Sequence, residues 1–145
     1  MPVYFSTIFG TLPVFGIKSE RKLADGIIGR MHHKGQAFSL AGKLSLNAFL
    51  YLLKKCDLFV GNNSGPVHMA ANLGVPTVGV YAGTSHAREW GPIGPPGTCR
   101  SSGVGCSPCY LTCYNDCRYD IPCLKYLHPE QVWQAALRML IPKWR

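Results

Sequence analysis

A cluster of hydrogen-bonding side chains follows a short apolar run in the middle of the chain. Residues 58–81 read LFVGNNSGPVHMAANLGVPTVGVY, with two asparagines and a serine before a glycine, a proline and a helix-like run. The first amides of a helix have no intrahelical partner and carry about half a positive charge, so small residues there suit an anion. The residues that could contact this anion are Asn63, Ser64, Gly65 and His68. Alternatively, Asn63 or Ser64 only caps the helix and His68 is an ordinary surface residue.

Five of the seven cysteines are crowded into one later stretch, which reads CSPCYLTCYNDCRYDIPC. Two cysteines separated by two residues supply two thiolates to one tetrahedral ion, and two of the later cysteines could complete a zinc site. An iron–sulfur cluster is compatible with the same ligand type. Free or packed thiols and disulfides are the alternatives, and disulfides require an oxidising compartment. The candidate ligands are Cys106, Cys109, Cys113, Cys117 and Cys123.

Strands and helices alternate with short connections over the first 81 residues. This alternation is typical of parallel βαβ units wound into an open sheet, so we predict an α/β, Rossmann-like fold with helices on both faces. Ligands bind such sheets at the carboxyl ends of the strands, where the polar cluster lies. The predicted elements are a strand ending near Phe15, a helix from Ser19 to Met31, a strand over 37–42, a helix over 45–56 capped by Ser45, a strand over 57–61, a helix over 65–74 and a strand over 76–81.

The remainder of the chain has less regular patterning. Residues 82–128 are rich in glycine and proline and show no sustained periodicity, which predicts a long irregular segment. A final helix is predicted over 129–140, with one side packed against the sheet. The residues expected on that side are Trp133, Ala136, Leu137 and Leu140, and those expected on one face of the helix over 45–56 are Leu46, Phe49, Leu50 and Leu53.

Composition narrows the class of protein. A chain of 145 residues with 47% hydrophobic residues can form one domain with a real core. Fifteen Lys and Arg against seven Asp and Glu give a net charge of +8, which favours anionic partners, although a solvated basic surface is the alternative. No nucleic-acid-binding motif is present, so we predict no nucleic-acid partner. The lack of a long apolar run and of a secretory signal predicts a cytoplasmic protein.

The segment LFVGNNSGPVHMAANLGVPTVGVYAGTSHAREWGPIGP closely resembles the C-terminal half of glycosyltransferase family 9, whose best-known members are ADP-heptose lipopolysaccharide heptosyltransferases. The resemblance extends upstream through GIKSERKLADGI and LAGKLSLNAFLYLLKKCDLFVG and downstream through CSPCY, from about Phe15 to Leu140. It implies a two-domain GT-B enzyme whose C-terminal domain holds the nucleotide sugar. Residues 1–145 are then a single nucleotide-sugar-binding domain, with a cysteine-rich loop within 99–123 and the N-terminal acceptor domain absent.

The resemblance also implies roles for individual residues. Many family members carry Asp at the position of Asn63, and this chain departs from them there. Glu20 matches the residue that hydrogen-bonds the ribose hydroxyls, although a first-turn Glu can simply complement a helix dipole. Asn63, Ser64, Gly65 and His68 match the donor diphosphate loop; Lys43, Leu44 and Leu46 match the wall of the base pocket, where apolar residues could equally be core; and Thr84, Arg88 and Trp90 match a loop near the transferred sugar.

The implied reaction is inverting transfer of heptose, or a related sugar, from a nucleotide diphosphate to lipopolysaccharide core or another surface glycan. The implied partners are a nucleotide sugar such as ADP-heptose and, through the missing domain, a glycolipid acceptor at the inner face of the inner membrane. The resemblance implies no cofactor for catalysis, and it implies that the isolated chain is inactive. The cysteine spacing makes structural zinc the metal expected. The alternatives are a non-catalytic nucleotide-binding module and a metal-bound protein-interaction module.

Overall fold

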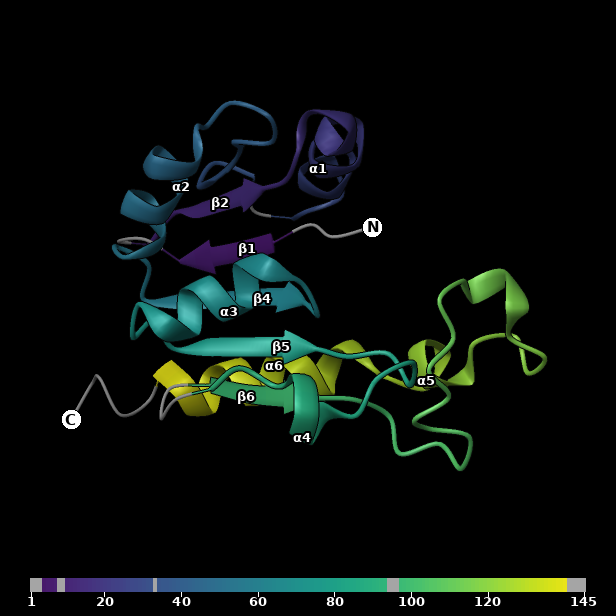
Figure 1. Ribbon diagram of the computed structural model, residues 1–145. Coiled ribbons are helices and arrows are strands. Elements are labelled where there is room, and N and C mark those ends of the chain that lie inside the picture. Colours follow the sequence, from purple (N-terminus) through teal and green to yellow (C-terminus); the bar gives the residue numbers. More distant parts are fainter. Residues whose placement is uncertain (1–3, 8–9, 33, 94–96, 141–145) are drawn as a thin grey trace.

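A central sheet organises the computed structural model, which describes residues 4–7, 10–32, 34–93 and 97–140 (Figure 1). The described residues form one six-stranded sheet in the order β3-β2-β1-β4-β5-β6. Its strands are β1 (Tyr4–Thr7), β2 (Leu12–Phe15), β3 (Ala37–Ser39), β4 (Leu58–Asn62), β5 (Thr77–Val80) and β6 (Gly97–Arg100).

Five of these six described strands run in the same direction. β2 pairs in parallel with β3, and β5 pairs in parallel with both β4 and β6, whereas β1 is antiparallel to β2 and β4. The predicted α/β fold with parallel pairing is confirmed, with β1 as a strand of opposite direction. Because the other strands are parallel, their carboxyl ends meet at one edge of the sheet.

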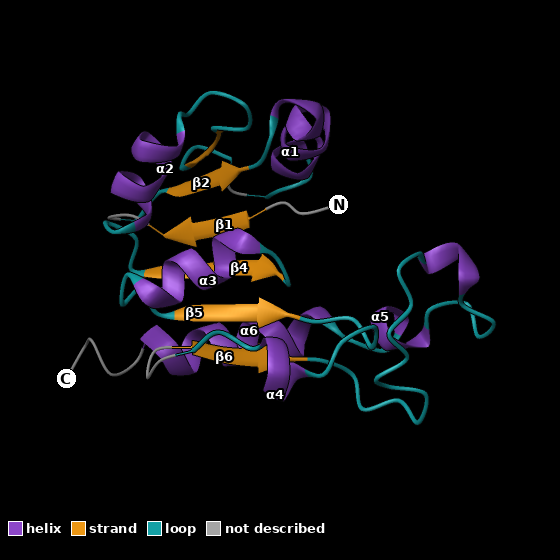
Figure 2. Ribbon diagram, in the orientation of Figure 1, coloured by secondary structure: helices purple, strands orange, loops and turns teal. Residues whose placement is uncertain are grey.

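Helices cover both faces of this sheet (Figure 2). Neighbouring residues of a strand point to opposite faces, and on β4 the buried Phe59 packs with α2 and α3 while the buried Leu58 packs with α6. Burying a side chain of this size stabilises the fold by about 1.5 to 3 kcal/mol. The longer helices are α1 (Arg21–Gly29), α2 (Leu46–Leu53), α3 (Gly65–Asn72) and α6 (Pro129–Leu140); the short ones are η1 (Lys18–Glu20), α4 (Ala87–Trp90), η2 (Tyr114–Asp116) and α5 (Pro122–Lys125).

Several helix predictions are confirmed and others need correction. Ser45 caps α2, since its side chain accepts a hydrogen bond from the amide of Ala48 at 3.3 Å. Ser19, where the first predicted helix begins, lies inside the 3-10 turn that precedes α1 and does not cap that helix. On α6, Ala136 is buried and Leu140 packs against the same cluster as predicted, whereas Trp133 was wrongly placed on this side, because it is exposed and Ala135 is buried instead.

Two strand predictions also change. β3 ends at Ser39, three residues earlier than predicted, because the chain turns there towards α2. β6 lies within the segment predicted to be irregular. Its four residues show no alternation of polar and apolar side chains, and only pairing with β5 makes them a strand.

One glycine fixes how the turn after β3 packs. Gly42 has a φ of +66°, and a Cβ at this position would lie 2.6 Å from the Cα of Lys18. Any larger residue would separate this turn from η1, which carries Glu20. Among the described residues, none of the helices combines the length and apolar character needed to cross a membrane.

Candidate functional site

Two pockets at the carboxyl edge of the sheet share the start of α3. The polar pocket has a volume of about 470 Å³ and includes Gly65, while the apolar pocket has a volume of about 300 Å³ and includes Pro66. Two consecutive residues of one helix therefore contribute to two pockets of different character. The polar pocket is lined by Asn63, Ser64, Gly65, His68, Thr84, Ser85, Trp90, Tyr110 and Leu111; the apolar pocket is lined by Phe15, Gly16, Ile17, Glu20, Leu40, Leu44, Ser45, Leu46, Phe49 and Pro66.

The turn before α3 is held from both sides. The backbone amide of Asn63 donates to the carbonyl of Val80 at 3.0 Å, and its side-chain amide donates to Oγ of Ser85 at 2.9 Å. The Ser64 hydroxyl does not cap the helix, since it donates to the carbonyl of Asn62 at 3.3 Å. The alternative, in which Asn63 or Ser64 serves only as a cap of α3, is therefore wrong.

The number of amides offered by α3 is smaller than the sequence suggests. Pro66 has no amide hydrogen, and the amide of Val67 donates to the carbonyl of Ser64 at 3.1 Å. Of these first helical positions, Gly65 is the one whose amide donates to none of the residues that the structure describes. A Cβ on Gly65 would lie 3.9 Å from the nearest atom outside the adjacent backbone, Cε of Met69, so the side of the turn where a side chain would stand is uncrowded.

Glu20 is placed at the apolar pocket and is only 4% exposed. One of its carboxylate oxygens, Oε2, accepts a hydrogen bond from the amide of Ile17 at 2.8 Å. The carboxylate thus stabilises the turn after β2, while its residue lines a pocket where a ribose hydroxyl could approach. This position agrees with both interpretations of Glu20, as a hydrogen-bonding partner of the ribose hydroxyls and as a first-turn residue that stabilises a helix start.

The residues assigned to the base pocket separate into two groups. Leu44 and Leu46 line the apolar pocket, and Leu46 is 60% exposed, so it does not belong to the core. Lys43 does not line this pocket, because its ammonium group donates to the carbonyl of Ser39 at 2.7 Å.

The three residues assigned near the sugar also separate. Thr84 and Trp90 line the polar pocket. Arg88 is exposed and is not among the lining residues; its backbone amide donates to Nδ1 of His86 at 3.1 Å. The structure therefore brings Thr84 and Trp90, but not the Arg88 side chain, to the start of α3.

Several lining residues were missed by sequence reasoning. Ser85 follows Thr84 in a segment already singled out, so its hydroxyl offered a weak signal. Tyr110 and Leu111 lie between cysteines in a segment without periodicity, and no local pattern points to them. They reach the polar pocket only because the long connection after β6 folds back, with the amide of Cys109 donating to the carbonyl of Gly83 at 2.8 Å.

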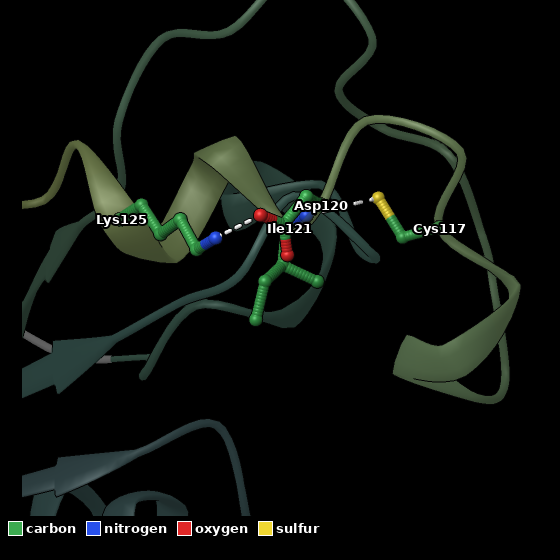
Figure 3. A network of polar contacts seen from close by, with 4 residues as sticks. All are labelled: Cys117, Asp120, Ile121 and Lys125. Atoms are coloured by element: carbon green, nitrogen blue, oxygen red, sulfur yellow. Dashed lines mark hydrogen bonds and ion pairs between the residues drawn. The ribbon is translucent and has the colours of Figure 1, made fainter.

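The cysteine-rich loop, here residues 101–121, extends beyond the carboxyl edge of the sheet (Figure 1). Near its end, the amide of Ile121 donates to Sγ of Cys117 at 3.3 Å, and Lys125 forms an ion pair with Asp120 (Figure 3). Asp120 and Ile121 have positive φ angles of 56° and 50°, which are uncommon for residues with a side chain. Local contacts thus hold the turn that leads into α5.

The predicted metal ligands are only partly brought together. Cys106, Cys109 and Cys117 line one cavity of about 150 Å³, whereas Cys113 is exposed and Cys123 is buried behind Gly83. All five are free thiols. Within the described part of the chain, no group of three or more His, Cys, Asp or Glu side chains is arranged to hold a metal ion.

Comparison with known proteins identifies the family. Residues 12–117, more than half of the chain, match the model of glycosyltransferase family 9 (heptosyltransferase). The chain belongs to this family. Among curated family 9 relatives, the chain is 27% identical over 130 residues to lipooligosaccharide heptosyltransferase 2 of Campylobacter jejuni, covering 88% of this chain and 40% of that protein. It is 41% identical over 44 residues to the lipopolysaccharide core heptosyltransferase OpsX of Haemophilus influenzae, covering 30% of this chain and 13% of that protein.

Solved structures show the same fold. ADP-heptose lipopolysaccharide heptosyltransferase II of Escherichia coli matches 93% of this chain and 38% of its own, with a TM-score of 0.74 and 18% identity. A family 9 glycosyltransferase of Veillonella parvula matches 88% of this chain and 36% of its own, with a TM-score of 0.73 and 23% identity. The chain therefore spans less than half the length of the relatives it matches.

Proposed function

We propose that this chain is the donor-binding half of an inverting GT-B glycosyltransferase that transfers heptose, or a related sugar, to lipopolysaccharide core or another surface glycan. The observation that carries this proposal is the meeting of a polar and an apolar pocket at the start of α3. A nucleotide sugar has the matching order of parts, since its diphosphate lies between an aromatic base and a sugar. Family membership supports the reaction class.

In this proposal the diphosphate lies at the start of α3, against the amide of Gly65 and beside Asn63, Ser64 and His68. The base lies in the apolar pocket against Leu44 and Leu46, and a ribose hydroxyl approaches Glu20. The sugar lies in the polar pocket near Thr84 and Trp90. Asn63 carries no charge, so it repels a diphosphate less than the Asp found in many relatives.

Transfer would form a bond from an acceptor oxygen to the anomeric carbon and break the bond from that carbon to the diphosphate. The acceptor proton passes to a general base, which we place in a second domain. Negative charge builds on the leaving diphosphate, and the α3 dipole stabilises it by about 0.3 to 1 kcal/mol, or about 2 when sheltered. Because the dipole contributes so little, other groups must supply most of the transition-state stabilisation. We therefore expect no transfer by the isolated chain.

Titration of the labelled chain with ADP, UDP and GDP tests the donor site by NMR. We expect ADP to shift the amide signals of Ser64, Gly65, Leu44 and Leu46 together, because one ligand spans both pockets. Shifts confined to one pocket, or no shifts at millimolar nucleotide, would contradict the proposal.

A matched glycine pair separates binding from folding. Gly65→Ala adds a methyl group without a close clash and should weaken ADP binding by about tenfold, because the side chain hinders the close approach of a phosphate to the Gly65 amide and weakens a hydrogen bond to a charged group. Gly26→Ala in α1 also meets open space, but Gly26 lines neither pocket, and this variant should leave ADP binding unchanged. Equal effects of the two variants would argue against a phosphate at Gly65.

Acceptor and membrane contacts belong to the same proposal. The acceptor is a glycolipid bound mainly by a second domain, and the enzyme acts at the cytoplasmic face of the inner membrane. The net charge of +8 favours contact with anionic lipid. Sedimentation with anionic and with neutral vesicles tests this contact, and equal binding to both would contradict it.

Structural zinc in the cysteine-rich loop is a separate proposal, supported by the three thiols that line one cavity. Because no described group is arranged to hold an ion, the loop would have to close further around zinc. Metal analysis of chain prepared under reducing conditions tests this. About one equivalent of zinc would support the proposal, and a trace of metal would remove it.

A further inference from the structure

Tyr110 is placed at the polar pocket by a loop that otherwise extends away from the sheet. Its side chain is 60% exposed and forms no hydrogen bond with the residues that the structure describes. Large aromatic side chains left open to solvent beside a polar pocket favour a ligand that has both apolar and polar surfaces. Tyr110 is thus available for a ligand in that pocket.

The backbone of Tyr110 is in an unusual conformation. Its φ is +52°, in the left-handed region that a residue with a side chain rarely adopts. Such a conformation persists only where the surroundings impose it, and an observed outlier is a reason to ask about function. On one side, the amide of Cys109 is bonded to the carbonyl of Gly83; on the other, Leu111 lines both the polar pocket and the cysteine cavity. The Cys109 bond fixes the backbone directly before Tyr110, which lines the polar pocket.

A second exposed aromatic residue lines the same pocket from a different element. Trp90 ends α4, and its backbone carbonyl accepts a hydrogen bond from the hydroxyl of the buried Tyr81 at 2.5 Å. This bond fixes the end of α4 to the strand end below it. The polar pocket is therefore lined by two exposed aromatic side chains, Trp90 and Tyr110, in addition to Gly65.

We propose that Tyr110 contacts the sugar ring of the donor, with Trp90 as its partner at the same pocket. This assignment rests on the proposed function, in which the diphosphate lies at Gly65. A pyranose ring has faces made of C–H groups and an edge of hydroxyls. Its C–H face stacks on an aromatic ring, while the phenol hydroxyl of Tyr110 is free to bond to a sugar hydroxyl. Tyr110 is then a specificity residue for the sugar and not for the nucleotide.

The experiment compares ADP with ADP-heptose binding to the 145-residue chain by calorimetry or NMR. Tyr110→Ala should weaken ADP-heptose binding by about tenfold, as expected for the loss of one aromatic contact, and should change ADP binding less than about twofold. Tyr110→Phe keeps the ring and should retain most of the affinity for ADP-heptose. Tyr114→Ala is the matched control, because this tyrosine lies in the same loop, is 50% exposed and is not among the residues that line the polar pocket.

The outcomes distinguish this assignment from the proposed function. If the unmodified chain binds neither ligand, the proposed function fails. If Tyr110→Ala weakens ADP and ADP-heptose equally, or weakens neither, the donor site stands and the assignment of Tyr110 to the sugar is overturned. A loss of both affinities together with a lower melting temperature would show a structural role, and Tyr110→Gly, which relaxes the positive φ, would then restore stability without restoring sugar binding.

Discussion

The start of α3 and the cysteine-rich loop both line the polar pocket, but they are held in place differently. The turn before α3 is bonded to the next strand through the amide of Asn63, and the helix buries Val67 and Ala70 completely. The loop buries Ser102, whose hydroxyl donates to the carbonyl of Cys123 at 2.5 Å, and its Cys109 amide donates to the carbonyl of Gly83 at 2.8 Å. One wall of the pocket is part of the core, and the other is attached to it at few points.

The two walls of the polar pocket should differ in local stability. Segments with few buried apolar contacts open at lower free energy than the core. The loop with Tyr110 and Leu111 can therefore open while the phosphate side of the pocket stays folded. The proposed nucleotide contacts belong to the stable wall, and the proposed sugar contact of Tyr110 belongs to the wall that opens more easily.

Removing a core side chain should give the largest effect. Phe59 is fully buried between β4 and the α2–α3 face, and Phe59→Ala should lower the free energy of unfolding by about 3 to 5 kcal/mol. Tyr119→Ala in the loop removes an exposed ring and should change it by less than about 0.5 kcal/mol. Urea denaturation of both variants measures the difference. Comparable losses would show that the loop is as tightly integrated as the core.

A pair of glycine substitutions compares the backbone of the two regions. Gly42→Ala introduces a Cβ that clashes with the backbone of Lys18 at a positive φ, and should cost about 1 to 3 kcal/mol. Gly105→Ala in the loop meets open space and should be neutral within about 0.5 kcal/mol. Thermal unfolding of the two variants gives both values. A stable Gly42→Ala variant would mean that the turn after β3 is free to move away from η1.

The hydrogen bond between Asn63 and Ser85 should have a moderate effect. The two side chains join the turn after β4 to the segment that follows β5, and a double-mutant cycle with alanine should give a coupling of about 0.5 to 1.5 kcal/mol. Unfolding of the single and double variants supplies the cycle. Additive effects would show that this bond does not fix the turn in solution.

The ion pair between Asp120 and Lys125 should contribute least. The two side chains are 82% and 52% exposed, so solvent screens the pair, and their coupling should be about 0.2 to 1 kcal/mol. The same cycle with alanine, repeated at low and high salt, should show a coupling that decreases as salt increases. A coupling unaffected by salt would indicate that the turn depends on geometry and not on charge.

Much of the fold could be predicted because the relevant signals are local. The apolar run from Leu58, the glycine and proline at the start of α3, and Gly74 after it mark a strand, a helix start and a helix end in order along the chain. The predicted cap at Ser45 formed for the same reason. β6 was not predicted and Trp133 was wrongly placed on the buried side of α6, since strand pairing and helix packing depend on neighbours that are distant in the sequence.

The candidate site was likewise predictable from the sequence only in part. The sequence by itself determined the α/β order of the elements, the polar turn at Asn63, Ser64 and Gly65, and its place at a strand end, because turn residues and periodicity act over a few positions. Only the tertiary structure decided that Leu46 lines a pocket, that Arg88 does not, and that Tyr110 lines the same pocket as Gly65. The placement of Leu46 and Arg88 depends on how their helices pack, and that of Tyr110 depends on how the long connection after β6 folds back to the sheet; no local preference encodes either.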